Sequence, residues 1–170
     1  MTRRELLALA ATSVVAAASG FAAWHGFGRA AQRRPELSFR DLDGRTRSLA
    51  EWDGKLLLLN FWATWCAPCV KEIPLLVEAQ QEFGPRGLQL VGIAMDQREP
   101  VAAFAQRLRI NYPLLVGEAD VVAAMDALGD ELGAFPFSVL VAPDGRILSR
   151  HSGDLSREEI RELLSKHLPG

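Results

Sequence analysis

The two cysteines of the 170-residue chain, Cys66 and Cys69, lie two residues apart in the segment NFWATWCAPCV (60–70). Thiols at this spacing could form a local structural disulfide, hold a metal ion, or carry out thiol–disulfide exchange. An apolar run, Leu56–Leu59, comes directly before the segment. The pair is therefore expected where a buried strand gives way to a helix.

The structural and metal interpretations both need more than the sequence shows near the pair. A disulfide that closes so short a loop contributes only about 2 kcal/mol. Two thiolates suit a soft ion such as Cu(I), but a closed zinc site needs four ligands. The three histidines, His25, His151 and His167, lie in other parts of the sequence, and we predict no metal site.

The exchange interpretation explains the placement of both cysteines. Unpaired N–H groups and the helix dipole at a helix N-terminus favour an anion, which lowers the pKa of a thiol there. Cys66 is the predicted nucleophile. Cys69, nearly one turn further on, is predicted to attack the mixed disulfide formed at Cys66 and release the partner. Pro68 suits the first helical turn, because the N–H that it lacks would have had no helical partner.

The elements around the pair predict an α/β domain. Four consecutive leucines indicate a strand buried on both faces, as in the centre of a parallel sheet. Asp43-Gly44 and Pro143-Asp144-Gly145 indicate turns between paired strands, and Ser156 with Glu159 forms a capping box. The expected strands are 55–62, 88–95, 112–116, 137–142 and 146–151, and the expected helices are 66–83, 100–108, 120–128 with Asp120 as cap, and a last one after Ser156.

The N-terminus differs from the rest of the chain. Arg3 and Arg4 precede the uncharged, alanine-rich run Leu6–Trp24. A helix of that length would be about 28 Å long, close to the thickness of the hydrocarbon core of a bilayer, so an uncleaved anchor is expected. A cleaved signal with Ala16-Ala17-Ala18 at its cleavage site is the alternative, and the paired arginines also resemble a twin-arginine export signal. We predict an anchor or signal over 1–25, a linker over 26–35 and one domain over 36–170.

The charge of the chain argues against nucleic acid as a partner. There are 19 basic and 21 acidic side chains, which gives a net charge of −2. A balance of this kind creates no large positive field that would attract a phosphate backbone. We therefore expect partners that are recognised by shape and by cysteine chemistry.

The segment FWATWCAPCVKEIP resembles the thioredoxin superfamily, in particular the TlpA/ResA/DsbE-like thiol-disulfide oxidoreductases, and the resemblance extends over roughly 37–168. It implies a thioredoxin-like three-layer α/β/α sandwich with a mixed central sheet. It also implies that Cys66 and Cys69 form the redox-active disulfide, with Cys66 as nucleophile and Cys69 as the resolving residue. No other cofactor is implied.

The same resemblance suggests roles for four further residues. Trp65 corresponds to the tryptophan beside the site, with core packing as its alternative. Glu72 corresponds to a glutamate that accepts or relays a proton, with a solvated surface residue as its alternative. Pro136 corresponds to a cis-proline facing the cysteines, and Phe135 before it would contact the substrate. Thioredoxin itself has a buried aspartate where this chain has Asn60, which cannot titrate.

The partners implied by the resemblance are exported cysteine-containing proteins, apocytochrome c among them, and a DsbD- or CcdA-like membrane protein as electron donor. The location implied is the periplasmic side of the bacterial inner membrane, with the N-terminal segment in the membrane, and the direction implied is disulfide reduction. Two rival functions stay open. A thiol peroxidase would have threonine where this chain has Ala63, and a copper-binding thioredoxin-like module would space its cysteines by three residues.

Overall fold

The computed structural model describes residues 32–130 and 132–168. The predicted anchor or signal over 1–25, and most of the predicted linker, lie outside these residues. The compact unit that carries the cysteines spans Arg33–Gly170. At its start, the backbone N–H of Arg34 donates to the carbonyl of Gly145, and the Arg34 guanidinium pairs with Asp53. Within the described part of the chain, no helix has the length and apolar character needed to cross a membrane.

A mixed sheet forms the middle layer of this unit. In the described residues it has seven strands in the order β2-β1-β5-β4-β3-β6-β7. Strands β3, β4 and β5 run parallel, and the remaining neighbours pair antiparallel. The strands are β1 (Ser38–Asp41), β2 (Thr46–Ser48), β3 (Leu56–Trp62), β4 (Leu88–Met95), β5 (Leu114–Gly117), β6 (Phe137–Val141) and β7 (Ile147–Ser152).

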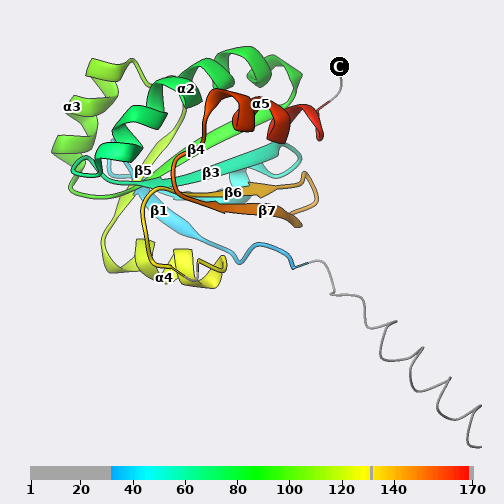
Figure 1. Ribbon diagram of the computed structural model, residues 1–170. Helices are drawn as coiled ribbons and strands as arrows, with labels where there is room; N and C mark the ends of the chain where they lie inside the picture. The colour runs from blue at the N-terminus through cyan, green and yellow to red at the C-terminus, as the bar shows by residue number, and fades with distance from the viewer. Residues whose placement is uncertain (1–31, 131, 169–170) are drawn as a thin grey trace, which may run out of the picture. The chain divides into compact units, whose positions relative to one another are not determined.

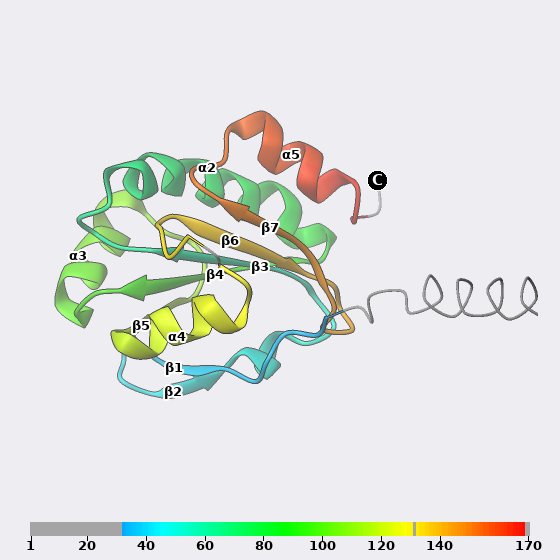
Figure 2. The same cartoon turned by 60° about the horizontal axis from the view of Figure 1, so that its bottom comes forward.

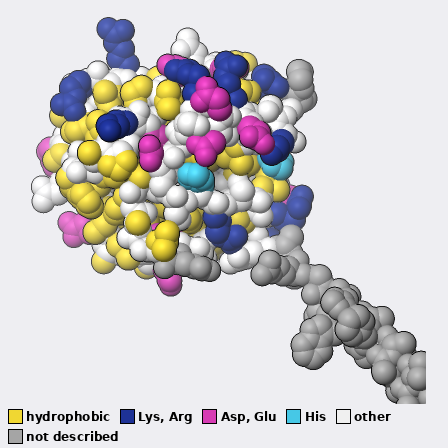
Figure 3. Space-filling view, viewed as in Figure 1, with side chains coloured by type: hydrophobic (Ala, Val, Ile, Leu, Met, Phe, Trp, Pro, Cys, Tyr) yellow, Lys and Arg dark blue, Asp and Glu magenta, His cyan; other side chains and the backbone are white. Residues whose placement is uncertain are grey.

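Helices cover both faces of the sheet, which confirms the predicted three layers (Figures 1 and 2). One face carries α2 (Ala67–Phe83), α3 (Arg98–Leu108) and α5 (Arg157–Ser165). The opposite face carries α4 (Ala119–Ala127) and the short 3-10 helix η1 (Leu49–Trp52), while a second 3-10 helix, η2 (Gly84–Arg86), follows α2. Figure 3 shows charged side chains gathered over α5, where Arg157 and Arg161 pair with Glu78 and Glu82 of α2.

The hydrophobic core has two clusters, one on each face of the sheet, and β3 contributes side chains to both. Every residue of β3 is buried, as the leucine run predicted. Because successive side chains of a strand point to opposite faces, Leu58 contributes to the cluster beneath α2 and α5, and Leu59 to the cluster beneath α4. This double burial fixes the end of β3, and with it the start of α2, where the cysteines lie.

Several local predictions are confirmed and one is wrong. The turn at Asp43-Gly44 joins the antiparallel pair β1 and β2, and Ser156 with Glu159 makes the capping box of α5. Asp120 is not the cap of α4, because the helix begins one residue before it and its N-cap is Glu118. The Asp120 carboxylate instead accepts hydrogen bonds from the backbone N–H groups of Glu118 and Val121.

Candidate active site

The cysteine pair lies at the junction of β3 and α2. Cys66 is the N-cap of α2, and its Sγ accepts the backbone N–H of Cys69 at 3.3 Å. The two cysteines form a disulfide, with Cα atoms 5.3 Å apart. The loop before them is held by Thr64, whose backbone N–H and hydroxyl both donate to the carboxylate of Asp96 beyond β4. The sulfur that a helix N-terminus stabilises as an anion is therefore that of Cys66.

The two sulfurs differ in how a partner can reach them. Both cysteines belong to the core cluster beneath α2, but Cys66 is 6% exposed and also lines a groove on the surface, whereas Cys69 is 1% exposed and does not line it. An incoming chain thus meets Cys66 first. This arrangement supports the predicted division between an attacking cysteine and a resolving cysteine.

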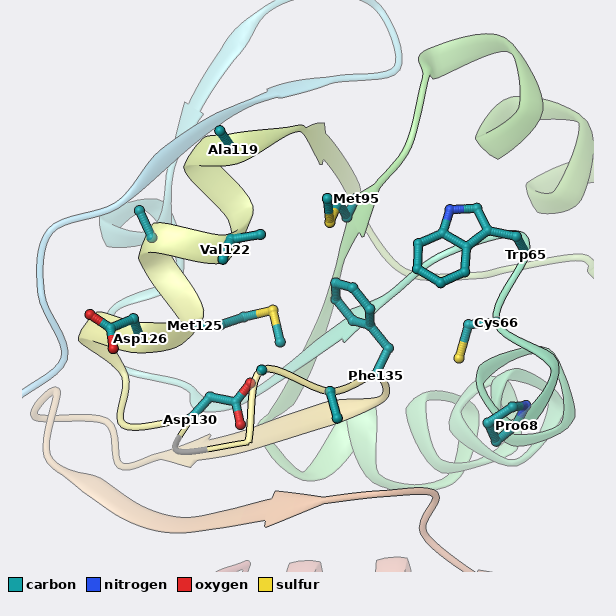
Figure 4. Close-up of a pocket in the computed structure, with 13 residues that line it drawn as sticks. Trp65, Cys66, Pro68, Met95, Ala119, Val122, Met125, Asp126, Asp130 and Phe135 are labelled. Carbon is teal, nitrogen blue, oxygen red and sulfur yellow. The ribbon is translucent and has the colours of Figure 1, made fainter.

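The groove beside Cys66, here called the Cys66 groove, has a volume of about 1020 Å³. Figure 4 shows Trp65 and Cys66 on one side and Val122 and Met125 of α4 on the other, with Met95 and Phe135 between them. Its complete lining is Trp65, Cys66, Pro68, Met95, Ala119, Val122, Ala123, Met125, Asp126, Asp130, Gly133, Ala134 and Phe135. The lining is mostly apolar, so the groove suits an apolar segment of another chain.

The proline loop closes the site opposite the cysteines. The Phe135–Pro136 peptide bond is cis, as the resemblance implied. Pro136 is buried, and its carbonyl accepts the backbone N–H of Gly153. The Phe135 ring meets the Trp65 ring edge to face, with centroids 5.8 Å apart. Pro136 directly precedes β6, and β6 pairs with β3, so the sheet brings the loop to the same end as the cysteines.

Trp65 is not a core residue. Its side chain is 67% exposed, which removes the core-packing alternative. The two aromatic residues around Pro136 differ in burial: Phe137 is 1% exposed in the core beneath α4, whereas Phe135 is half-buried and packs against that core. Trp65 and Phe135 are thus positioned to contact a bound chain.

Glu72 is buried rather than solvated. It lies one turn after Cys69 on α2, and its side chain is surrounded by the core on that face. Burial raises the pKa of its carboxyl group to about 7, while hydrogen bonds from the Leu155 backbone N–H and the Asn60 amide oppose the rise and the charge of Asp154 adds to it. A carboxyl group with such a pKa exchanges protons readily near neutral pH.

Asn60 connects Glu72 to the neighbouring strand. Its Nδ2 donates to Ser138 Oγ at 3.1 Å and to Glu72 Oε2 at 3.5 Å, and all three side chains are buried. Tyr112 lies close enough that the Glu72 charge adds to the effect of burial in raising the pKa of its hydroxyl. Asn60 therefore belongs to the polar network around Glu72, although it cannot itself exchange a proton.

The sequence did not point to several residues of this site. Ser138 and Leu155 bind the Asn60–Glu72 pair from β6 and from the loop before α5, and Met95, Val122, Met125 and Asp130 line the groove. None of them belongs to a motif, and they meet only because the sheet brings distant segments together.

His151 lies on β7, where its Nε2 is 3.4 Å from the carbonyl of Asp154.

Comparison with known proteins agrees with this geometry. The AhpC/TSA family matches residues 30–150. Thiol-disulfide oxidoreductase ResA of Geobacillus thermodenitrificans is 30% identical over 138 residues, which is 79% of this chain and 76% of the relative. Thioredoxin-like protein YneN of Bacillus subtilis is 30% identical over 137 residues, 78% of this chain and 77% of the relative.

A solved structure gives the fold independently. The crystal structure of a thiol:disulfide interchange protein of the thioredoxin family from Chlorobium tepidum superposes with a TM-score of 0.72 at 28% identity. The match covers 80% of this chain and 95% of that protein. The expected thioredoxin-like sandwich is thereby confirmed.

Proposed function

Because the chain belongs to the AhpC/TSA family and carries its cysteine pair at the start of α2, we propose that it acts as a thiol-disulfide oxidoreductase in the direction of reduction. The observation that carries the proposal is the placement of the Cys66–Cys69 disulfide at a helix N-terminus, beside an apolar groove that Cys66 lines and Cys69 does not. ResA relatives that are named as thiol-disulfide oxidoreductases support it.

The proposed reaction has two exchange steps. In the reduced protein, the Cys66 thiolate attacks one sulfur of a substrate disulfide, which forms a mixed disulfide and releases the first substrate thiolate. The Cys69 thiolate then attacks Cys66 Sγ, which restores the Cys66–Cys69 disulfide and releases the second substrate thiolate. Two electrons pass to the substrate, so a dithiol donor must reduce the protein again.

The surroundings of the cysteines support each step. The Cys69 N–H, 3.3 Å from Cys66 Sγ, stabilises negative charge on that sulfur when it attacks the substrate disulfide. Glu72 is proposed to take the proton of the Cys69 thiol, directly or through one water, because its pKa of about 7 suits that transfer. Trp65 and Phe135 are proposed to contact the substrate beside the reacting sulfur.

The backbone of the proline loop offers a second contact. The N–H and C=O groups of Phe135 have no hydrogen-bond partner among residues 32–130 and 132–168. An extended substrate segment that passes Cys66 could pair with them as a short strand does. We propose that this pairing holds the substrate disulfide in line with Cys66.

The cellular setting of the reaction is also part of the proposal. The N-terminal segment is proposed to anchor or export the domain, so that it works on the periplasmic side of the inner membrane. Exported cysteine-containing proteins, apocytochrome c among them, would be its substrates, and a DsbD- or CcdA-like membrane protein its electron donor. The relatedness to ResA proteins supports this setting.

Trapping tests the proposal. The Cys69→Ala variant of the full chain should accumulate mixed disulfides in cells, and Cys66→Ala, the matched control, should accumulate none. A glutathione redox titration of the wild type should give a potential near that of glutaredoxins or lower, since values approaching that of DsbA belong to oxidants. If Cys69→Ala captures no protein, the exchange function is wrong. If the reduction potential is that of an oxidant, the proposed direction of reduction is wrong. Peroxide consumption by the reduced protein at the rate of disulfide exchange would instead favour a thiol peroxidase.

A further inference from the structure

Asp130 lies in the Cys66 groove with one carboxylate oxygen unused. Its side chain is only 7% exposed, although most acidic side chains of the domain lie in solvent. Oδ1 accepts the backbone N–H of Leu132 at 3.1 Å. Oδ2 is buried and has no hydrogen-bond partner in the described part of the chain, and Figure 4 shows the carboxylate facing the groove.

A buried carboxylate without a partner is costly, so its presence needs an explanation. Burial removes the water that would otherwise solvate the charge, and an ion pair or hydrogen bond is the usual compensation. The described residues that line the groove include no lysine, arginine or histidine. The Arg150 side chain of β7 lies against Gly129, the residue before Asp130, and its Nε donates to the carbonyl of Leu128. Asp130 Oδ2 nevertheless accepts no hydrogen bond from Arg150 or from any other residue among those described. The missing partner would therefore come from whatever occupies the groove.

The rest of the groove indicates what that occupant must look like. Three large apolar side chains of the described residues are exposed, namely Trp65 (67%), Val122 (46%) and Leu132 (73%). Two of them line the groove, and the third follows Asp130 closely in the chain. Exposed apolar side chains that gather in one place mark a surface that binds another molecule. The groove thus combines an apolar wall with a single buried negative charge.

We propose that Asp130 selects substrates by pairing with a cationic side chain. The preferred substrate is a protein segment with an apolar residue near the reacting cysteine and a lysine or arginine that reaches Asp130 Oδ2. The inference rests on the proposed oxidoreductase function and adds a substrate class to it. Asp130 lies in the groove rather than at the sulfurs, so it acts on substrate binding and not on the exchange chemistry.

Asp126 provides a matched control within the same groove. It is also an aspartate, and it is on α4 among the lining residues, but its side chain is exposed. A solvated carboxylate gains little from an ion pair, because water and salt screen the charge. Asp126→Asn should therefore leave substrate preference unchanged, whereas Asp130→Asn should remove it.

The test measures the second-order rate constant with which the reduced full chain, in a single turnover, releases the chromogenic thiol from synthetic peptides whose single cysteine carries that thiol in disulfide linkage. Each peptide has apolar neighbours and either lysine or glutamine at one position, scanned on both sides of the cysteine. At the best position the wild type should prefer lysine by about tenfold, which corresponds to about 1.4 kcal/mol. The ratio should fall to about one in Asp130→Asn and stay at about tenfold in Asp126→Asn.

Stability gives a second measurement. Asparagine keeps the acceptor for the Leu132 N–H and removes the unpaired charge, so Asp130→Asn without substrate should unfold at the same temperature as the wild type or higher. If Asp130→Asn fails to fold, the same ratio is measured in Asp130→Ser. Equal rates on lysine and glutamine peptides at every position, or a lysine preference that survives in the Asp130 variant, would overturn the role of Asp130.

The glutamine peptides separate this inference from the proposed function. If the wild type exchanges with them at the same rate as with the lysine peptides, only the inference about Asp130 fails. If it exchanges with neither set, the oxidoreductase function itself fails.

Discussion

Glu72→Gln tests the buried carboxyl group beneath the active site. In the folded protein its pKa is about 7, raised from 4.5 mainly by burial. Between these two values the folded protein holds a proton that the unfolded chain has lost. The free energy of unfolding should therefore be highest below about pH 4.5 and should fall as the pH rises to about 7, after which this group adds no further change.

The expected size of this loss of stability follows from the shift in the pKa of Glu72. A difference of one pKa unit corresponds to about 1.36 kcal/mol, so the rise from 4.5 to about 7 predicts a loss of about 3 kcal/mol across this range. Glutamine cannot titrate, so Glu72→Gln should lack this loss. Every other ionisable group is present in both proteins, so the titration of Glu72 dominates the pH dependence of their difference.

The assay is urea denaturation of the oxidised wild type and of oxidised Glu72→Gln at a series of pH values from about 4 to 8. The difference between their unfolding free energies should change by about 3 kcal/mol in favour of the variant as the pH rises. A constant offset between the two proteins is also expected, because an amide and a carboxyl group bind the Leu155 N–H and the Asn60 amide differently. A difference that does not vary with pH would refute the raised pKa of Glu72.

Three further predictions concern neighbouring residues. Trp65→Ala should raise KM for apolar disulfide peptides by about tenfold in steady-state kinetics. Because the ring is exposed, the same change should alter the free energy of unfolding in urea by less than about 0.5 kcal/mol. Asn60→Asp would place a second carboxylate next to Glu72, so it should cost about 3 kcal/mol at about pH 8 and less in acid, and a pH-independent cost would contradict this. Ser156→Ala should cost about 1 kcal/mol through the lost cap of α5 in a denaturation experiment, and an unchanged midpoint would show that the cap is dispensable.

Local patterns in the sequence predicted the elements that hold the cysteines. The leucine run of β3 is buried on both faces, and Pro68 lies within the first turn of α2, as their residue types indicate. These predictions held because each depends on residues next to one another in the chain. The cap of α4 was misplaced because Asp120 has a side chain typical of an N-cap, but the helix begins one residue before it.

The environment of Glu72 and the Cys66 groove could not be predicted in the same way. Glu72 follows Lys71 in a helix whose buried face is set by the packing of α5 and the loop before it. Asp130 and Met125 line the same groove as Cys66 only because β6 pairs with β3 and α4 covers the face of the sheet opposite α2. The sequence predicts which residues can do chemistry, but the tertiary packing decides how deeply they are buried.

Cys66, at the N-terminus of α2, is proposed to be the thiol that reacts first. The most direct measurement is the rate of alkylation of each cysteine in the reduced protein as a function of pH, with the modified residue identified by mass spectrometry. We expect Cys66 to be labelled well before Cys69, and the pKa of the Cys66 thiol to lie below the ~8.5 of a free cysteine. Preferential labelling of Cys69, or a Cys66 thiol that reacts no faster than a free cysteine, would contradict it.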